Sequence, residues 1–304
     1  MITAESVKKL RETTGAGMMD CKKALAEVNG DFEAAIDYLR TKGLAAAAKK
    51  QGRIAADGLV GTFVNNKMGV VVEVNCETDF VAKNTDFQEL LSTVADQVFN
   101  YTPVNVDDLL TTKLTNGMTL ADKVSELTLK IGEKIAVRRF ATLPIAGTNT
   151  NGTYVHSGKI GVIVNFTTTK AETITNPTFQ EYMKDVCMHV TAADPKFVVA
   201  SEIDEDFKKR EADIYTAQLK EQGKPENMIG KIVEGKLQKL ATDVCLVEQK
   251  FVKDPDITVK DLTKKVSETL GDTITINKFI KFTLGEGIEK KEDNFAEEVA
   301  KMMN

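Results

Sequence analysis

The 304-residue sequence lacks the patterns by which membrane proteins and many enzymes are recognised. No stretch approaches the ~20 consecutive apolar residues that a membrane-spanning helix needs, which argues against a place in a membrane. Neither a glycine-rich phosphate loop of the Walker or Rossmann type nor a Gly-x-Ser-x-Gly nucleophile elbow occurs. We therefore predict a protein that is not an enzyme and that carries no cofactor.

Cysteine and histidine are also scarce. The four cysteines stand far apart and form no Cys-x-x-Cys pair, which favours reduced thiols in a cytosolic protein over a disulfide framework or a zinc ribbon. The two histidines, His156 and His189, fit structural or exposed positions better than catalytic ones. We predict no metal site. The cysteines are Cys21, Cys76, Cys187 and Cys245.

Positive charge is in the minority, with a formal net charge of −5 and a pI of about 5.4. An acidic total argues against direct binding of nucleic acid, which usually needs a basic face. Basic clusters do occur, but they are scattered and lack interleaved aromatic residues, so solvated faces explain them better. An RNA-associated or chaperone-like accessory role remains the alternative. The clusters are Lys49-Lys50, Arg138-Arg139 and Lys208-Lys209-Arg210.

Residues 1–43 predict three short helices, each stopped by a glycine. Thr3 is a candidate cap for the first helix and Asp31 for the third. A three-helix module of this size is typical of docking, because it has no room for a cleft. Residues 44–56 follow as a linker whose alanine-rich part favours a helix. The three stopping glycines are Gly15, Gly30 and Gly43.

The next part of the chain is duplicated. Shifting the sequence by 92 residues aligns 32 positions without a gap, and ten of them are identical. Each copy begins with a β-hairpin pattern, continues into an amphipathic helix pattern and ends in a further helix and strand. We predict an α+β core with two subdomains, residues 57–146 and 147–286, and antiparallel sheets. The stretch Gly147–Gly152 is the expected loop between the copies.

An insertion interrupts the second copy. Lys123-Val124-Ser125-Glu126 returns as Lys265-Val266-Ser267-Glu268 at a spacing of 142, which implies 50 extra residues near positions 195–245. Narrow apolar seams on both sides of a Gly-Lys-Pro turn predict an antiparallel coiled-coil hairpin over about 200–242, with Ile214 in one seam. Two ordinary surface helices are the alternative. Residues 287–304 predict a C-terminal helix that carries Phe295 and Val299 on one face.

One difference between the copies concerns function. Asp79-Phe80 in the first copy aligns with Ala171-Glu172 in the second, so the scaffold does not need this aromatic ring. We interpret Phe80 as a probe aimed at a partner rather than a plug of its own core. An enzyme with Asp79 as general base lacks an acid or nucleophile nearby in the sequence.

Two long segments, Leu10–Leu25 and Glu73–Lys83, resemble the signatures of the bacterial elongation factor Ts family, the guanine nucleotide exchange factors of elongation factor Tu. The similarity extends over essentially the whole chain. It implies an N-terminal module like ubiquitin-associated domains, a two-subdomain α+β core, an antiparallel coiled-coil arm and a C-terminal module. It also implies a bacterial cytoplasmic protein, since no transit peptide precedes the first module. Asp293-Asn294-Phe295 departs from the family's more acidic pattern.

The resemblance implies a function without bond chemistry. Such a factor binds the GDP form of elongation factor Tu, disrupts its Mg²⁺ and phosphate site and promotes GDP release so that GTP can bind. The segment Thr78, Asp79, Phe80 and Val81 is implied in dislocating the Mg²⁺. We predict docking contacts at Arg11, Met18, Met19, His156, Phe295 and Val299. Whether the arm forms a homodimer or binds something else stays open.

Overall fold

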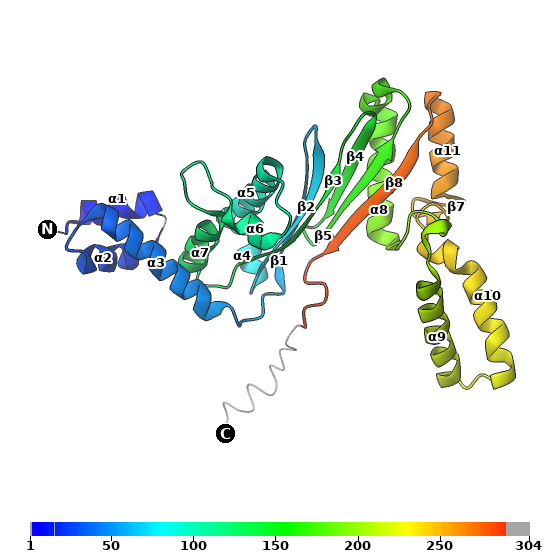
Figure 1. The fold of residues 1–304 in the computed structure, drawn as a ribbon, viewed down its shortest axis with the longest axis horizontal. Coiled ribbons are helices and arrows are strands. Elements are labelled where there is room, and N and C mark those ends of the chain that lie inside the picture. The colour runs from blue at the N-terminus through cyan, green and yellow to red at the C-terminus, as the bar shows by residue number, and fades with distance from the viewer. Residues whose placement is uncertain (1, 15, 290–304) are drawn as a thin grey trace. The chain divides into compact units, whose positions relative to one another are not determined.

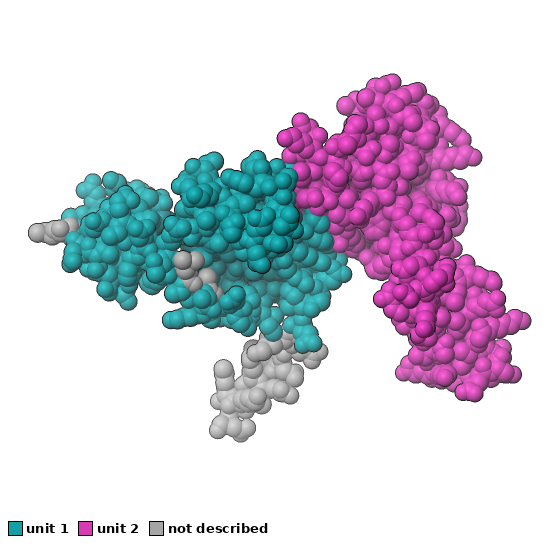
Figure 2. All heavy atoms as spheres, in the orientation of Figure 1, with its two compact units in different colours: residues 1–61, 72–141, 282–304 teal, residues 62–71, 142–281 magenta. Residues whose placement is uncertain are grey.

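The protein folds into helices and antiparallel sheets, which confirms the predicted α+β class (Figure 1). The computed structural model describes residues 2–14 and 16–289. The chain forms two compact units (Figure 2): the described residues of 1–61, 72–141 and 282–304, and residues 62–71 and 142–281. Within the described residues, no helix has the length and apolar character that crossing a membrane requires.

The first unit begins with α1 (Ala4–Thr14), α2 (Met18–Glu27) and α3 (Phe32–Lys50). Their apolar faces enclose a small core around Leu10, Leu25 and Leu39. Asp31 caps α3 as predicted, because its side chain accepts a hydrogen bond of 2.9 Å from the amide of Ala34. Gly30, at φ 88°, follows α2 and satisfies the Leu25 carbonyl, which confirms the predicted stop there.

Gly43 does not stop α3, and that prediction was wrong. The helix continues through it to Lys50. The alanine-rich stretch after Gly43 has high helix propensity, and α3 packs along α7 (Leu120–Ile131). A Cβ atom on Gly43 would lie 3.4 Å from the carbonyl oxygen of Ser125. The glycine therefore permits a close helix–helix approach rather than a helix end.

The first copy of the duplication forms a three-stranded sheet with helices beside it. The order of its strands is β1-β2-β3, so the hairpin is extended by a strand that arrives after the helices. The short helix α6 was not predicted from the sequence. The elements are β1 (Asp57–Val64), β2 (Met68–Cys76), α4 (Asp79–Ala82), α5 (Thr85–Tyr101), α6 (Val106–Thr111), α7 and β3 (Ala136–Pro144).

The second copy repeats this topology with the strand order β4-β5-β8. Strands β4 and β5 pair antiparallel from Asn149↔Thr167 to His156↔Ile160. Because β4 begins at Asn149, most of the expected loop Gly147–Gly152 is strand instead. The elements are β4 (Asn149–His156), β5 (Ile160–Thr167), η1 (Ala171–Thr175), α8 (Pro177–Ala193), α11 (Val259–Leu270) and β8 (Thr275–Thr283).

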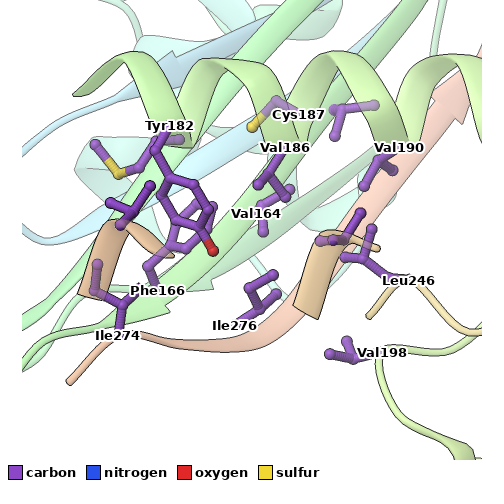
Figure 3. Packing of buried hydrophobic residues seen from close by; sticks show 14 of the residues in the cluster. Val164, Phe166, Tyr182, Val186, Cys187, Val190, Val198, Leu246, Ile274 and Ile276 are labelled. Carbon is purple, nitrogen blue, oxygen red and sulfur yellow. The ribbon is translucent and has the colours of Figure 1, made fainter. Parts of the chain in front are cut away.

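The core of the second unit lies between its sheet and α8 (Figure 3). Alternate residues of β5, Val164 and Phe166 among them, meet α8 residues spaced three or four apart. Phe166 and Tyr182 meet edge to face, with ring centroids 5.6 Å apart. This packing follows the alternating and helical apolar patterns of the sequence.

The structure confirms the duplication and corrects its second offset. The pairs β1/β4 and α5/α8 begin 92 residues apart, as predicted. Helices α7 and α11 both start with a Thr-x-x-Asp capping box and end at a left-handed glycine, Gly132 and Gly271, which are 139 residues apart. The spacing of 142 was therefore wrong, and the insertion has 47 residues instead of 50. A slip of three residues is nearly one helical turn and preserves the apolar face.

The insertion contains a helical hairpin (Figure 1). Helices α9 (Glu205–Glu221) and α10 (Glu226–Val244) pack on each other through Leu219, Ile229 and Val233. Ile214, which we placed in the seam, is 48% exposed. The short elements η2 (Ala200–Glu202), β6 (Lys250–Phe251) and β7 (Asp254–Thr258) flank the hairpin. The predicted C-terminal helix, with Phe295 and Val299, lies outside the described residues.

All four cysteines are free and buried. Burial raises the pKa of each thiol, to about 12 for Cys76 and to about 11 for Cys245. These thiols stay protonated at neutral pH, as expected of small apolar core residues.

Candidate partner-binding site

The candidate site is the turn that leads from β2 into α5. It contains the single-turn helix α4, preceded by Thr78 in extended conformation. Asn84 then caps α5 by accepting a 2.8 Å hydrogen bond from the amide of Asp86. The turn is thus bounded on both sides by elements whose positions the core fixes.

A carboxylate holds the base of this turn. Glu133, just after α7, accepts the amide of Thr78 at 3.0 Å and its hydroxyl at 2.7 Å. The thiol of Cys76 lies 3.1 Å from the carbonyl oxygen of Thr78 and donates to it. Glu133 was not predicted from the sequence, although its counterpart in the second copy, Asp272, is also acidic.

The turn places neighbouring side chains in opposite environments. Val81 and Ala82 are buried in the first unit. Phe80 is 78% exposed, although burial of such a ring is favourable by about 2–3 kcal/mol. The ammonium of Lys83 lies 5.6 Å from the ring centroid. The ring does not fill the core of its own subdomain.

Asp79 lies beside the ring and forms an ion pair with Lys83. The Lys83 ammonium and the Asp79 carboxylate are 2.8 Å apart, with Asp79 about half exposed. A surface pair of this kind contributes little to stability. The carboxylate therefore stays accessible for contacts with another molecule.

The predicted docking residues of the N-terminal helices point outward. Met18 is 58% exposed and Met19 is 73% exposed at the start of α2, and Arg11 is exposed at the end of α1. Cys21 and Leu25 of the same helix face the small core instead. The twin methionines thus add no apolar volume to that core.

His156 lies at the end of β4 in the second unit. It is exposed, and its Nδ1 atom lies 3.3 Å from the hydroxyl of Tyr154. His189 is buried and has a structural role: it accepts the Val252 amide and bonds Gln249. Phe295 and Val299 lie outside the described residues.

The Arg138-Arg139 cluster is engaged within the first unit. Arg138 and Arg139 donate to opposite oxygens of buried Glu73, at 2.8 and 2.6 Å. Burial opposes ionisation of Glu73, but bonds from Arg138, the Gly285 amide and Arg139 outweigh it and lower its pKa. This pair is part of the fold rather than a solvated basic face.

The part of the chain that the structure describes contains no group of three or more His, Cys, Asp or Glu side chains placed to hold a metal ion. The candidate site is an exposed ring and a carboxylate on a firmly held turn. Such an arrangement suits contact with another macromolecule.

Comparison with known proteins identifies the family. The family model described as "Elongation factor TS" matches residues 77–286. The chain is 48% identical over 305 residues to an elongation factor Ts from Clostridium perfringens, covering 99% of both proteins. It is 46% identical over 304 residues to one from Trichlorobacter lovleyi, covering 98% of this chain and 97% of that protein. The chain belongs to the elongation factor Ts family.

Proposed function

We propose that this chain is a cytoplasmic guanine nucleotide exchange factor for elongation factor Tu and performs no bond chemistry of its own. Family membership supports the partner. The observation that carries the mechanism is Phe80, 78% exposed on a turn that Glu133 holds in place. The same position in the duplicated scaffold is Glu172, so folding does not require the ring.

Exchange follows from linked binding. A factor that binds the nucleotide-free GTPase more tightly than the GDP form must, by thermodynamic reciprocity, weaken the binding of GDP to the same degree. GDP is held largely through its phosphates and Mg²⁺. The factor therefore needs a wedge near the metal ion and a wide grip elsewhere.

Phe80 is the wedge in this proposal. Its ring enters an apolar pocket of the partner and recovers the burial free energy that it lacks in the free factor. Asp79 brings a carboxylate to the same place and acts on the metal site through its charge. Thr78 and Val81 support the conformation of the turn. The hydroxyl of Thr78 is hydrogen-bonded to Glu133, and the side chain of Val81 is buried.

Several further surfaces contribute binding contacts to elongation factor Tu in this proposal. Met18 and Met19 supply flexible apolar contacts, which suit an adaptable docking surface, and Arg11 adds a charge beside them. His156 provides a contact from the second unit. Phe295 and Val299 extend the grip from the C-terminal segment.

Other partners have less support. Direct binding of nucleic acid is disfavoured because Glu73 already engages Arg138 and Arg139. The hairpin of α9 and α10 is a candidate surface for homodimer formation or for another contact.

The test is release of fluorescent GDP from elongation factor Tu. We expect Phe80→Ala to reduce kcat/KM for exchange by about a hundredfold. The reason is that the ring makes its contact with the GTPase in the state from which GDP leaves. Val104→Ala is the matched control, since Val104 is an apolar side chain that is 86% exposed elsewhere in the first unit. An unchanged kcat/KM for exchange by folded Phe80→Ala would remove Phe80 from the mechanism.

A further inference from the structure

The residues just after α3, the last helix of the N-terminal module, are bonded to the residues that precede the Phe80 turn. We propose that Arg53, Glu133 and Lys134 are positioning residues that join the three-helix module and the Phe80 turn into one rigid clamp. The inference rests on the proposed function, because it concerns how two contact surfaces act on one partner. It assigns a role to residues that do not touch the partner themselves.

The first link is lateral, between α3 and α7. Arg40 grips Asp122 with two bonds, Nε to Oδ1 at 2.9 Å and Nη2 to Oδ2 at 2.5 Å. Asp122 is 5% exposed and also closes the capping box of α7. Gly43 brings the two helices into close contact near Ser125. A forked, partly buried ion pair of this type fixes orientation as well as distance.

The second link joins the C-terminal ends of the two helices. The Lys50 ammonium bonds the carbonyl of Gly132, which ends α7. The Lys134 ammonium bonds the carbonyls of Gln51 and Arg53, at 2.6 and 2.8 Å, just after α3. The carbonyls of Gly132 and Gln51 belong to the C-caps of α7 and α3, where helix ends leave such groups without partners. Each helix end is thereby tied to the other by a lysine.

The third link reaches the turn. Glu77 accepts the backbone amide of Lys134 at 2.6 Å and Arg53 Nη1 at 3.2 Å. Glu133 holds Thr78, the next residue. Residues 133–134 therefore bond both the end of α3 and the two residues that precede α4. An unbroken path of short contacts runs from the N-terminal module to the base of the Phe80 turn.

The second copy acts as an internal control for this path. Its carboxylate Asp272 holds the equivalent turn by accepting the amide of Thr169 at 2.9 Å and the hydroxyl of Thr173 at 2.5 Å. Glu77 and Lys134, however, correspond to Thr169 and Thr273. The carboxylate strap thus belongs to the shared scaffold. The bridge from residue 134 to the preceding helix belongs to the copy that carries the ring.

A rigid bridge has a direct consequence for binding. When two surfaces of one molecule meet the same partner, the second contact forms at an effective concentration set by the connection between them. A connection held in the bound geometry lowers the entropy lost on binding. Loosening it leaves both surfaces intact and yet weakens their joint action. Phe80 would then contribute less than it does in the native chain.

The experiment measures exchange by the full chain without the side-chain bonds of Arg53 and Lys134. Lys134→Met combined with Arg53→Met deletes the charged groups and keeps the apolar stems; Arg53 is half exposed, so the fold tolerates the change. We expect kcat/KM for GDP release to fall about tenfold, whereas Lys134→Arg, which keeps a donor, stays within about twofold.

The discriminating readout is the cost of Phe80→Ala in each background. We expect a loss of about a hundredfold in the native chain and of less than about tenfold in the double variant. Hydrogen exchange should quicken at residues 77–83 and stay unchanged at 169–175. Equal costs of Phe80→Ala in both backgrounds, or full exchange by the double variant, would overturn the clamp. No cost of Phe80→Ala in the native chain would instead overturn the proposed function.

Discussion

The turns after β2 and after β5 are two versions of one structure. In both, a carboxylate between the helix and the third strand holds the turn, Glu133 in the first copy and Asp272 in the second. In both, one side chain points inward and is buried, Val81 and its counterpart Thr173. The outward residue differs, because the exposed ring of Phe80 corresponds to the exposed carboxylate of Glu172. The two copies therefore share the carboxylate that holds the turn and differ in the exposed residue that the turn presents.

The buried polar centres of the two sheets differ in the same way. Glu73 and Arg138 correspond to Asn165 and Asn277 in the second copy. The first pair is ionic, with 2.8 Å between Arg138 Nη1 and Glu73 Oε1. The second is a neutral amide pair at 2.8 Å. One scaffold thus tolerates two chemistries at its centre, provided that each buried group finds a partner.

The largest expected effect comes from breaking the ionic centre. Glu73→Ala leaves two partly buried arginines without their carboxylate and should lower the free energy of unfolding by about 3–5 kcal/mol. Asn165→Ala removes only neutral hydrogen bonds and should cost about 1–3 kcal/mol. Urea denaturation followed by circular dichroism compares the two variants. Equal losses would show that charge adds nothing at this position.

The second prediction converts one turn into the other. Phe80→Glu gives the first copy the residue that stands at the corresponding position, Glu172, in the second. The change should reduce exchange about a hundredfold, because the ring is lost and a charge replaces it. Its free energy of unfolding should change by no more than about 0.5 kcal/mol, since the site is exposed. Fluorescent GDP release and urea denaturation measure the two effects. The reciprocal Glu172→Phe should leave exchange unchanged, and a gain there would contradict the assignment to one copy.

The third prediction removes the shared support. Glu133→Ala and Asp272→Ala each delete charge-assisted bonds to a turn and should each cost about 2 kcal/mol of unfolding free energy. Only Glu133→Ala should also slow GDP release, by about tenfold, because only that turn carries Phe80. Parallel denaturation and exchange assays separate stability from function. Slower exchange by Asp272→Ala at full folding would place a second contact on the other turn.

The smallest effect is a difference in acid sensitivity. The pKa of Glu73 is lower in the folded protein than in the unfolded chain, so its contribution to stability is present above its unfolded value, near pH 4.5. That contribution is lost as pH falls through the lower folded value. Asn165 does not titrate. Urea denaturation between pH 7 and pH 3 should therefore show a steeper acid loss in the native chain than in Glu73→Gln.

Much of this architecture could be predicted from the sequence. The hairpins, the amphipathic helices and the 92-residue offset follow from local apolar periodicity and from repeated identities. The exposure of Phe80 was also predicted, because the duplicated scaffold supplied a comparison at Glu172. Both predictions depend on local patterns in the sequence and on its internal repeat, which can be read without knowing contacts between distant residues.

The errors and omissions concern contacts between distant segments. Gly43 has the pattern of a helix stop, but its role depends on Ser125, far away in the sequence. The bonds of Glu133 and Lys134 to residues 77, 78, 51 and 53 give no periodic signal either. The 142-residue offset failed because helical periodicity tolerates a slip of one turn. Packing decided each of these features.

The protected cysteines have a practical consequence for studying this molecule in motion. Because the thiolate is the nucleophilic form, buried thiols with raised pKa values react slowly with maleimides. A single cysteine introduced at exposed Val104 would therefore take up a dye selectively without prior deletion of the native ones. Binding of the labelled chain to its proposed partner can then be followed by fluorescence.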